Sequence, residues 1–236
     1  ALLRFAFPLF PEAALGSASL LLPAGLIGLY YAAWIAFAQT DMKRLVAYSS
    51  IGHMGFIVIG TAIWNELSLT GTVLQMVNHG LSTSALFILV GMLDERLHTR
   101  RLADAGGLWK SMPLLGGCFL FFGLASAGLP GLNNFVSELL ILVGAFTERP
   151  LVGALGFGAM VLTLVYVLRI VQDIFFGPPQ SSLNPGDLTA RELLILAPLA
   201  AAVLFLGLHP QPLLDMLQEP VRILLEQASP LQTAGR

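Results

Sequence analysis

Three side chains that can carry protons, His53, His79 and Glu138, stand inside long apolar stretches of this 236-residue sequence. An ionised group at the centre of a bilayer costs about 2.5–3.5 kcal/mol or more, so residues of this kind usually serve a function. Imidazole changes its charge near neutral pH, and imidazoles and carboxylates can pass protons through waters. If the chain places the three residues at one level, the pattern predicts a proton relay within a membrane.

The stretch that leads to Glu138 also contains a helix break. In Gly128-Leu-Pro-Gly131 the proline removes a backbone donor and the glycines relax the backbone. Polar backbone groups freed at membrane depth are tolerated only beside protein or a wet cavity, and discontinuous helices of this kind form ion sites in transporters. Between residues 113 and 146, Glu138 is the only acidic or basic side chain. A titrating role is favoured, and a protonated packing carboxyl is the alternative.

The elements that position these residues are membrane spans. Hydrophobic residues make up 56% of the chain, charged residues only 11%, and the mean hydropathy is +0.80, unlike ordinary soluble domains. About 20 apolar residues cross a hydrocarbon core. The sequence predicts an all-α fold, a polytopic transmembrane helix bundle that forms one membrane domain over 1–236. Its six expected spans are about 19–39, 45–64, 69–93, 113–146 (discontinuous near Pro130), 151–176 and 193–208, and an interfacial helix is expected at 213–227.

These spans place the three proton carriers at similar depth. At 1.5 Å per residue, His53 lies about 16 Å from Met42 and His79 about 15 Å from Leu69, and Glu138 is comparably deep from the opposite side. Gly80 predicts a local distortion of the third span. Several polar residues surround His79 in the sequence: Gln75, Asn78, Ser82, Thr83 and Ser84. For either histidine, a neutral side chain hydrogen-bonded to a neighbouring helix is the alternative to a relay.

The turn between the first two spans carries Asp41 and Lys43, which are candidates for proton uptake from one side of the membrane. Anchoring of the chain at the interface explains the same two charges equally well. Of the 12 lysines and arginines in the chain, eight fall in or beside the loops on this side of the bundle. The positive-inside rule therefore places this side in the cytoplasm.

Composition also excludes several classes of function. The single cysteine, Cys118, cannot form a cysteine-based metal or iron–sulfur site by itself, so redox chemistry is expected in partners. A net charge of −2 offers no basic surface for nucleic acid. No nucleotide-binding loop, nucleophile elbow or metal-ligand set is present in the sequence. Because the chain starts at Ala1 within an apolar stretch, we expect it to be part of a longer protein.

Several motifs resemble the antiporter-like membrane subunits of respiratory complex I. They include QTDMKRLVAYSSIGHMGF (39–56), VNHGL (77–81) and GLPGLNNFVSE (128–138), and the resemblance covers nearly the whole chain. It implies a proton-translocating subunit of an NADH:quinone oxidoreductase in the bacterial plasma membrane, driven by electron transfer in other subunits. In family terms, His53 and His79 form the central relay, and Glu138 passes protons on after the helix break.

The resemblance also implies the surroundings of the chain. No cofactor is expected in this chain, whereas NADH, FMN, iron–sulfur clusters and quinone are expected in partner subunits. Its partners are the other membrane-arm subunits and the lipid bilayer. Two alternatives are a D-type subunit of a multisubunit sodium/proton antiporter and a passive membrane scaffold. Glu138 argues against the first, because related antiporter-like subunits generally carry lysine there, and the buried titratable groups argue against the second.

Overall fold

The computed structural model describes residues 2–178 and 186–234, so the predicted domain limits at 1 and 236 lie outside it. Within the described residues the elements are helices, and one isolated bridge pairs Asp41 with Arg101. Five helical segments are long and apolar enough to cross a membrane. They are α3 (Ala18–Ala38), α4 (Met42–Ile63), α5 (Glu66–Leu97), α8 with its terminal π-helical turn (Pro150–Val171 and Gln172–Phe176) and α9 (Ala190–Leu208).

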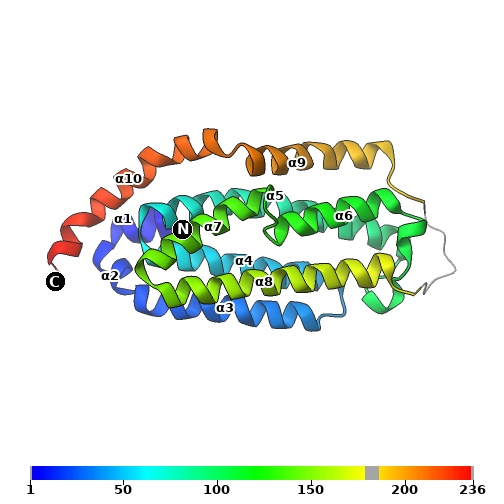
Figure 1. The fold of residues 1–236 in the computed structure, drawn as a ribbon, viewed down its shortest axis with the longest axis horizontal. Helices are drawn as coiled ribbons and strands as arrows, with labels where there is room; N and C mark the ends of the chain where they lie inside the picture. The colour runs from blue at the N-terminus through cyan, green and yellow to red at the C-terminus, as the bar shows by residue number, and fades with distance from the viewer. Residues whose placement is uncertain (1, 179–185, 235–236) are drawn as a thin grey trace.

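The predicted discontinuous span is confirmed. Helix α6 (Pro113–Ser126) ends before the break and α7 (Asn133–Glu148) begins after it. Gly128 and Gly131 adopt left-handed φ angles of 72° and 92°, which a side chain would disfavour. The pair α6 and α7 together supplies the sixth span of the predicted bundle, and in Figure 1 the two helices meet near the middle of the molecule.

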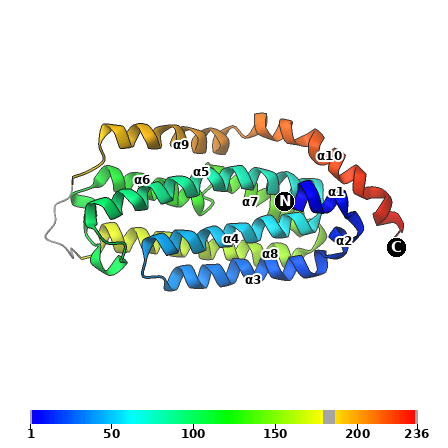
Figure 2. The same cartoon turned by 180° about the vertical axis from the view of Figure 1, so that it is seen from behind.

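Short connections force neighbouring spans to run antiparallel. The Asp41 side chain accepts a hydrogen bond from the Arg44 amide at 2.9 Å and so caps α4. Asn65 and Ser68 form a reciprocal capping box at the start of α5, one residue after α4 has ended in the left-handed Trp64. The tight turn leaves α4 and α5 side by side (Figure 2).

Helix α5 is longer and more regular than its predicted span. It continues for 32 residues without interruption, so the distortion predicted at Gly80 is wrong at the level of secondary structure. A single glycine weakens a helix by only about 1 kcal/mol, and packing on both sides of α5 outweighs that cost.

Two apolar clusters fill the bundle at different heights. The larger cluster includes Leu89, Phe119 and Ile170, toward the ends of the helices that the loop 98–112 joins. The smaller one includes Phe56 and Ile141, toward the other end. Along α4, His53 falls between these two regions, so a polar layer separates two apolar ones.

The remaining elements cover the bundle from outside. Helix α9 lies along its flank with only Leu196 and Val203 buried. The predicted interfacial helix is confirmed as a helix, α10 (Gln211–Ala234), which is mostly exposed and packs through Val221 near Trp64. Short helical segments complete the described chain: Leu2–Ala6, α1 (Phe7–Leu9), α2 (Pro11–Gly16), Leu102–Asp104 and Leu108–Lys110.

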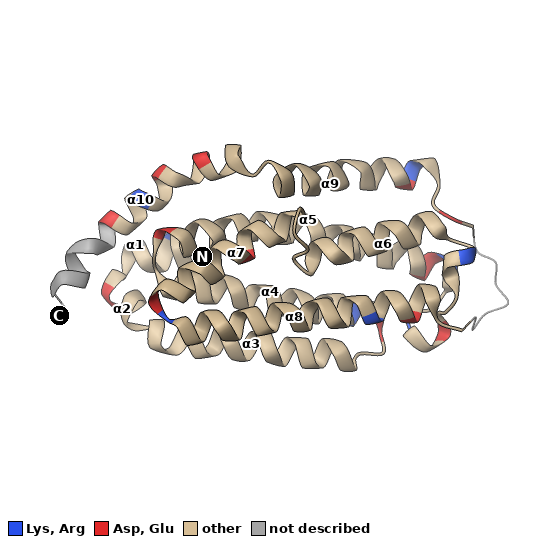
Figure 3. Ribbon diagram, in the orientation of Figure 1, with Lys and Arg blue, Asp and Glu red and all other residues tan. Residues whose placement is uncertain are grey.

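Basic side chains gather at one end of the bundle (Figure 3). We call this the basic end; there, residues 39–41 join α3 to α4 and residues 98–112 join α5 to α6. The clustering follows the loop pattern from which the sequence predicts a cytoplasmic side.

Candidate proton-relay site

The centre of the site is a direct contact between His53 on α4 and Glu138 on α7. The Nδ1 atom of His53 lies 2.9 Å from Oε1 of Glu138, although the residues are 85 positions apart in the chain. Their side chains are only 2% and 1% exposed. A buried carboxylate is stable only when it is paired or hydrogen-bonded, so this contact is what allows Glu138 to hold a charge.

A glutamine from α5 supports the same carboxylate. Gln75 donates from Nε2 to Oε1 of Glu138 at 3.1 Å. The Ser137 hydroxyl donates in turn to Oε1 of Gln75, which fixes the orientation of that amide. Residues of α4 and α5 therefore both contact one carboxylate oxygen of Glu138, which α7 carries.

The helix break brings α7 close enough for this arrangement. A Cβ atom on Gly128 would lie 2.8 Å from Oε2 of Glu138. On α5, a Cβ on Gly71 would lie 2.7 Å from the Ser137 carbonyl oxygen, so a glycine is required where α5 and α7 cross. The backbone conformation and the approach of the carboxylate both demand glycine at position 128.

The second histidine lies beside the first. The rings of His53 and His79 are 5.1 Å apart between centroids and tilted by 40°. His79 Nε2 lies 2.8 Å from the Ser50 hydroxyl, and its Nδ1 lies 3.0 Å from the Thr83 hydroxyl. Both ring nitrogens thus face groups that can donate or accept a proton, which either tautomer of His79 can use.

The other nitrogen of His53 faces the end of α6. Its Nε2 lies 3.1 Å from the Ser126 hydroxyl, the last residue of α6 before the break. A hydroxyl can accept from a protonated ring or donate to a neutral one. His53 can therefore be stabilised both as a cation paired with Glu138 and as a neutral imidazole.

Asparagines hold the start of α7 against α5. Asn78 donates to the Asn133 carbonyl at 2.8 Å, and Asn133 donates back to the Asn78 carbonyl at 2.9 Å. These reciprocal bonds tie the first turn of α7 to the middle of α5. Among the described residues, the amide oxygens of Asn78, Asn133 and Asn134 are buried without a donor. The crossing of α5 with the start of α7 therefore carries amide oxygens that are able to accept further hydrogen bonds.

The structure does not bring the other two predicted residues to this site. Asp41 lies at the basic end, where its carboxylate caps α4 and its backbone pairs with that of Arg101. Lys43 is exposed two residues further along, in the first turn of α4. Both positions agree with the anchoring alternative, and a part for them in proton uptake stays a prediction.

Sequence reasoning missed several partners of the relay. Gln75 stands out as a polar neighbour of His79 one helical turn away, yet its contact with Glu138 depends on how α5 crosses α7. No feature of the sequence indicates Ser126 as a partner, because only the fold of the break places its hydroxyl beside His53. Among the described residues, no cluster of three or more metal-binding side chains occurs.

The fold is a polytopic helical membrane bundle with one broken span, and a buried histidine–carboxylate pair lies at the break. These two features together are typical of one class of membrane subunits. The family model described as "NADH:quinone oxidoreductase/Mrp antiporter, TM" matches residues 1–163, which include His53, His79 and Glu138. The chain belongs to this family. The protein is a multi-pass membrane protein of the antiporter-like type.

Two bacterial proteins within this family are similar to most of the chain. The chain is 49% identical over 215 residues to NADH-quinone oxidoreductase subunit M of Pseudomonas aeruginosa, which is 91% of this chain and 42% of that protein. It is 43% identical over 217 residues to subunit M of Escherichia coli K12, covering 91% of this chain and 43% of that protein. The chain thus spans less than half the length of these relatives.

Solved structures agree on the fold. A chain of respiratory complex I from Thermus thermophilus with bound NADH matches with a TM-score of 0.90 and 32% identity, over 97% of this chain and 48% of that one. A chain of the Mrp complex from Dietzia matches with a TM-score of 0.79 and 20% identity, over 94% of this chain and 48% of that one, a likeness of fold alone.

Proposed function

We propose that this chain is part of a proton-translocating membrane subunit of an NADH:quinone oxidoreductase, equivalent to the subunit M relatives. The observation that carries the proposal is the buried contact of 2.9 Å between His53 and Glu138 at the break between α6 and α7. A titratable base that touches a titratable acid in an apolar interior can hold one proton in alternative places.

The geometry supports a short sequence of proton transfers. A proton that reaches His53 makes an imidazolium, which the Glu138 carboxylate stabilises through Nδ1. Transfer of the Nδ1 proton to Glu138 leaves both groups neutral, with the remaining imidazole proton on Nε2. A charge that appears on a neighbouring group shifts this balance strongly, because interactions between charges are weakly screened in a low dielectric. Release of the proton from Glu138 and return of the imidazole to its Nδ1–H tautomer then reset the pair.

His79 extends this pair toward the next part of the relay. Its ring lies beside that of His53, and its two nitrogens face hydroxyls on α4 and α5. Proton exchange between the two imidazoles needs one bridging water at the observed ring separation. We expect the relay to run across the bundle, from α5 through α4 to α7.

The energy for translocation comes from outside the chain in this proposal. We expect the redox cofactors, NADH, FMN, iron–sulfur clusters and quinone, to be bound by partner subunits and not by this chain. Its partners are other membrane-arm subunits of complex I and the surrounding lipid of a bacterial plasma membrane. Support comes from the names of the relatives and from the matched chain of the Thermus complex.

A D-type subunit of a multisubunit sodium/proton antiporter is the second candidate, since the matching family includes Mrp antiporters. Glu138 and the higher identity to subunit M favour the oxidoreductase. Copurification decides between them: an assembly that oxidises NADH and reduces quinone supports the first, and an assembly without those activities supports the second.

The test of the proposed relay is Glu138→Gln in the intact complex. Glutamine keeps the shape and hydrogen bonding but cannot titrate, so we expect proton pumping and the coupled quinone reduction to fall by about a hundredfold while assembly stays normal. Proton uptake and quinone reduction in membranes measure both. Full pumping at wild-type levels of assembled complex would show that Glu138 carries no proton, and a passive scaffold would then explain the chain better.

A further inference from the structure

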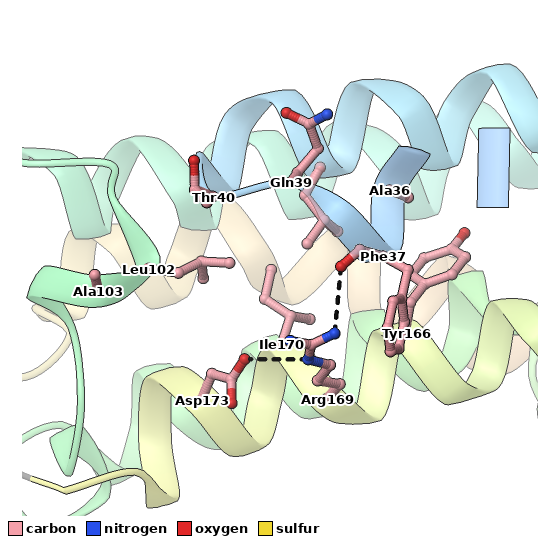
Figure 4. A pocket seen from close by; sticks show the side chains of 11 residues that line it. Ala36, Phe37, Gln39, Thr40, Leu102, Ala103, Tyr166, Arg169, Ile170 and Asp173 are labelled. Carbon is pink, nitrogen blue, oxygen red and sulfur yellow. Dashed lines mark hydrogen bonds and ion pairs between the residues drawn. The ribbon is translucent and has the colours of Figure 1, made fainter. Parts of the chain in front are cut away.

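A polar cavity opens at the basic end and leads toward the relay. It has a volume of about 140 Å³ and lies between the end of α3, the start of α4 and α8. Gln39, Thr40, Arg169 and Asp173 line its outer part (Figure 4). Its mouth therefore combines amide, hydroxyl and charged groups, which favour water.

An ion pair orders one wall of this cavity. Arg169 Nε lies 3.6 Å from Oδ2 of Asp173, which belongs to the π-helical turn that follows α8. The same guanidinium sits 4.2 Å from the centre of the Phe37 ring and donates to the Phe37 carbonyl at 3.4 Å. These contacts join α8 to the end of α3 and keep the cavity wall in place.

Tyr166 forms the inner end of the cavity. It is only 2% exposed, and its hydroxyl lies 2.7 Å from the Ser49 hydroxyl on α4. Apolar neighbours of this pair include Leu45, Val167 and Ile170, and the buried Thr163 on α8 lies one turn from Tyr166. Phenylalanine and alanine would fill the same space without burying two hydroxyls, so packing alone does not account for the pair.

A second, smaller cavity lies beside Tyr166, and apart from Ser49 and Tyr166 its lining is apolar. Its volume is about 20 Å³, and Tyr166 and Ser49 both line it. Leu45 and Ile170 border this cavity as well as the outer one. A space of this size holds about one water, and that water would have the two hydroxyls as partners.

Ser49 connects the region of the two cavities with the candidate relay through its position on α4. It precedes His53 by four residues on the regular helix α4, so the two side chains lie on one face a turn apart. A bridging water or a change of the serine rotamer spans that turn. Ser50, the next residue, contacts His79 directly.

We propose that the outer cavity, Tyr166 and Ser49 form the proton access path from the basic end to His53. In this path Tyr166 accepts a proton on its oxygen from water in the outer cavity as its own proton passes to Ser49. Ser49 passes one on toward His53 in the same way. Each hydroxyl ends with the number of protons with which it began, so no charge stays on Tyr166. The cavity adjoins the predicted uptake residues Asp41 and Lys43, but neither lines it. This inference rests on the proposed proton-translocating function.

The test replaces the tyrosine hydroxyl and keeps the ring. In the assembled complex, Tyr166→Phe should lower the rate of proton pumping by about tenfold. Tyr30→Phe is the matched control, because Tyr30 also donates a hydrogen bond between helices, to the Leu155 carbonyl at 2.8 Å, and does not line the cavity. Ser49→Ala should resemble Tyr166→Phe. Because the remaining flux would depend on water alone, the solvent isotope effect on pumping should rise in both variants and stay unchanged in Tyr30→Phe.

A second measurement does not depend on removing Tyr166. Thr40→Cys in a Cys118→Ser background places a thiol at the mouth of the cavity, and a bulky thiol reagent should then block pumping. Unchanged pumping in Tyr166→Phe, equal losses in Tyr166→Phe and Tyr30→Phe, or unimpaired pumping after complete labelling at position 40 would each overturn the path. These results leave the proposed function standing as long as Glu138→Gln abolishes pumping, whereas full pumping in Glu138→Gln removes the function itself.

Discussion

Two acid–base pairs in this protein differ in what their surroundings allow. His53 and Glu138 are almost fully buried and meet through one contact at 2.9 Å. Arg96 and Glu192, which join α5 to α9 at the basic end, are 14% and 16% exposed and meet through two contacts of 2.7 and 2.8 Å. Arg96 also donates to the carbonyl oxygens of Gly186 and Asp187.

The difference lies in the base. Arginine cannot lose its proton in a protein, so a bidentate arginine–carboxylate pair is a permanent clamp. Histidine changes its charge near neutral pH, so its pair with a carboxylate can exist charged or neutral. The candidate relay has a base of reversible charge at the centre of the bundle, whereas the Arg96–Glu192 pair has a permanently charged base where α9 is attached to α5.

The largest effect on the central pair should come from Gly128→Ala. The added Cβ would lie 2.8 Å from Oε2 of Glu138, and the left-handed backbone adds strain of about 1–2 kcal/mol. The side chains of Met160 and Glu138 must both move, which disturbs the contact of Glu138 with His53. We expect pumping to be lost almost completely, as measured by proton uptake in membranes. Gly117→Ala on α6, where a Cβ meets nothing within 4 Å, is the control and should pump normally.

His53→Gln should have a smaller effect on the same pair. Glutamine can still donate to Glu138 but cannot hold a proton, so transfer must proceed through water and the neighbouring hydroxyls. We expect pumping to fall by roughly tenfold, less than in Glu138→Gln. A loss as great as that in Glu138→Gln would mean that no water replaces the imidazole.

Breaking the clamp should affect stability more than transport. Arg96→Ala leaves Glu192 with only its contacts to Thr189 and removes the donor of two backbone carbonyl oxygens, which costs about 1–3 kcal/mol. We expect a lower thermal stability of the complex in detergent, with an unchanged ratio of protons to electrons in the molecules that remain assembled. A changed ratio would show that the clamp takes part in coupling.

The smallest effect should come from Asp187→Ala. The Asp187 carboxylate accepts from the amides of Leu114 and Leu115 at 2.7 and 3.0 Å, and so caps α6 from a distant part of the chain. Loss of a cap costs about 0.5–2 kcal/mol. Thermal stability should fall slightly and pumping should be normal. Asp187→Asn should restore most of the stability, because an amide oxygen can also accept; a failure to do so would assign the effect to charge.

The sequence by itself determined the class of fold and the three titratable residues of the candidate relay. Apolar runs of membrane-spanning length define the helices whatever their packing, because the bilayer leaves few alternatives for the backbone. The proline and glycines at 128–131 define the break, since their backbone preferences are local. A lone carboxylate or histidine in such a run stands out by its residue type alone, because burying it in a membrane is costly.

Only the tertiary structure decided which groups meet. The contacts of Glu138 with His53 and Gln75 depend on how α7 crosses α4 and α5, and small residues such as Gly71 set that crossing. The Tyr166–Ser49 pair also cannot be found from the sequence. Burying a tyrosine or a serine in an apolar helix costs too little free energy for either residue to stand out as functional. Contacts between residues tens of positions apart depend on the packing of whole helices, which no local pattern of residues records.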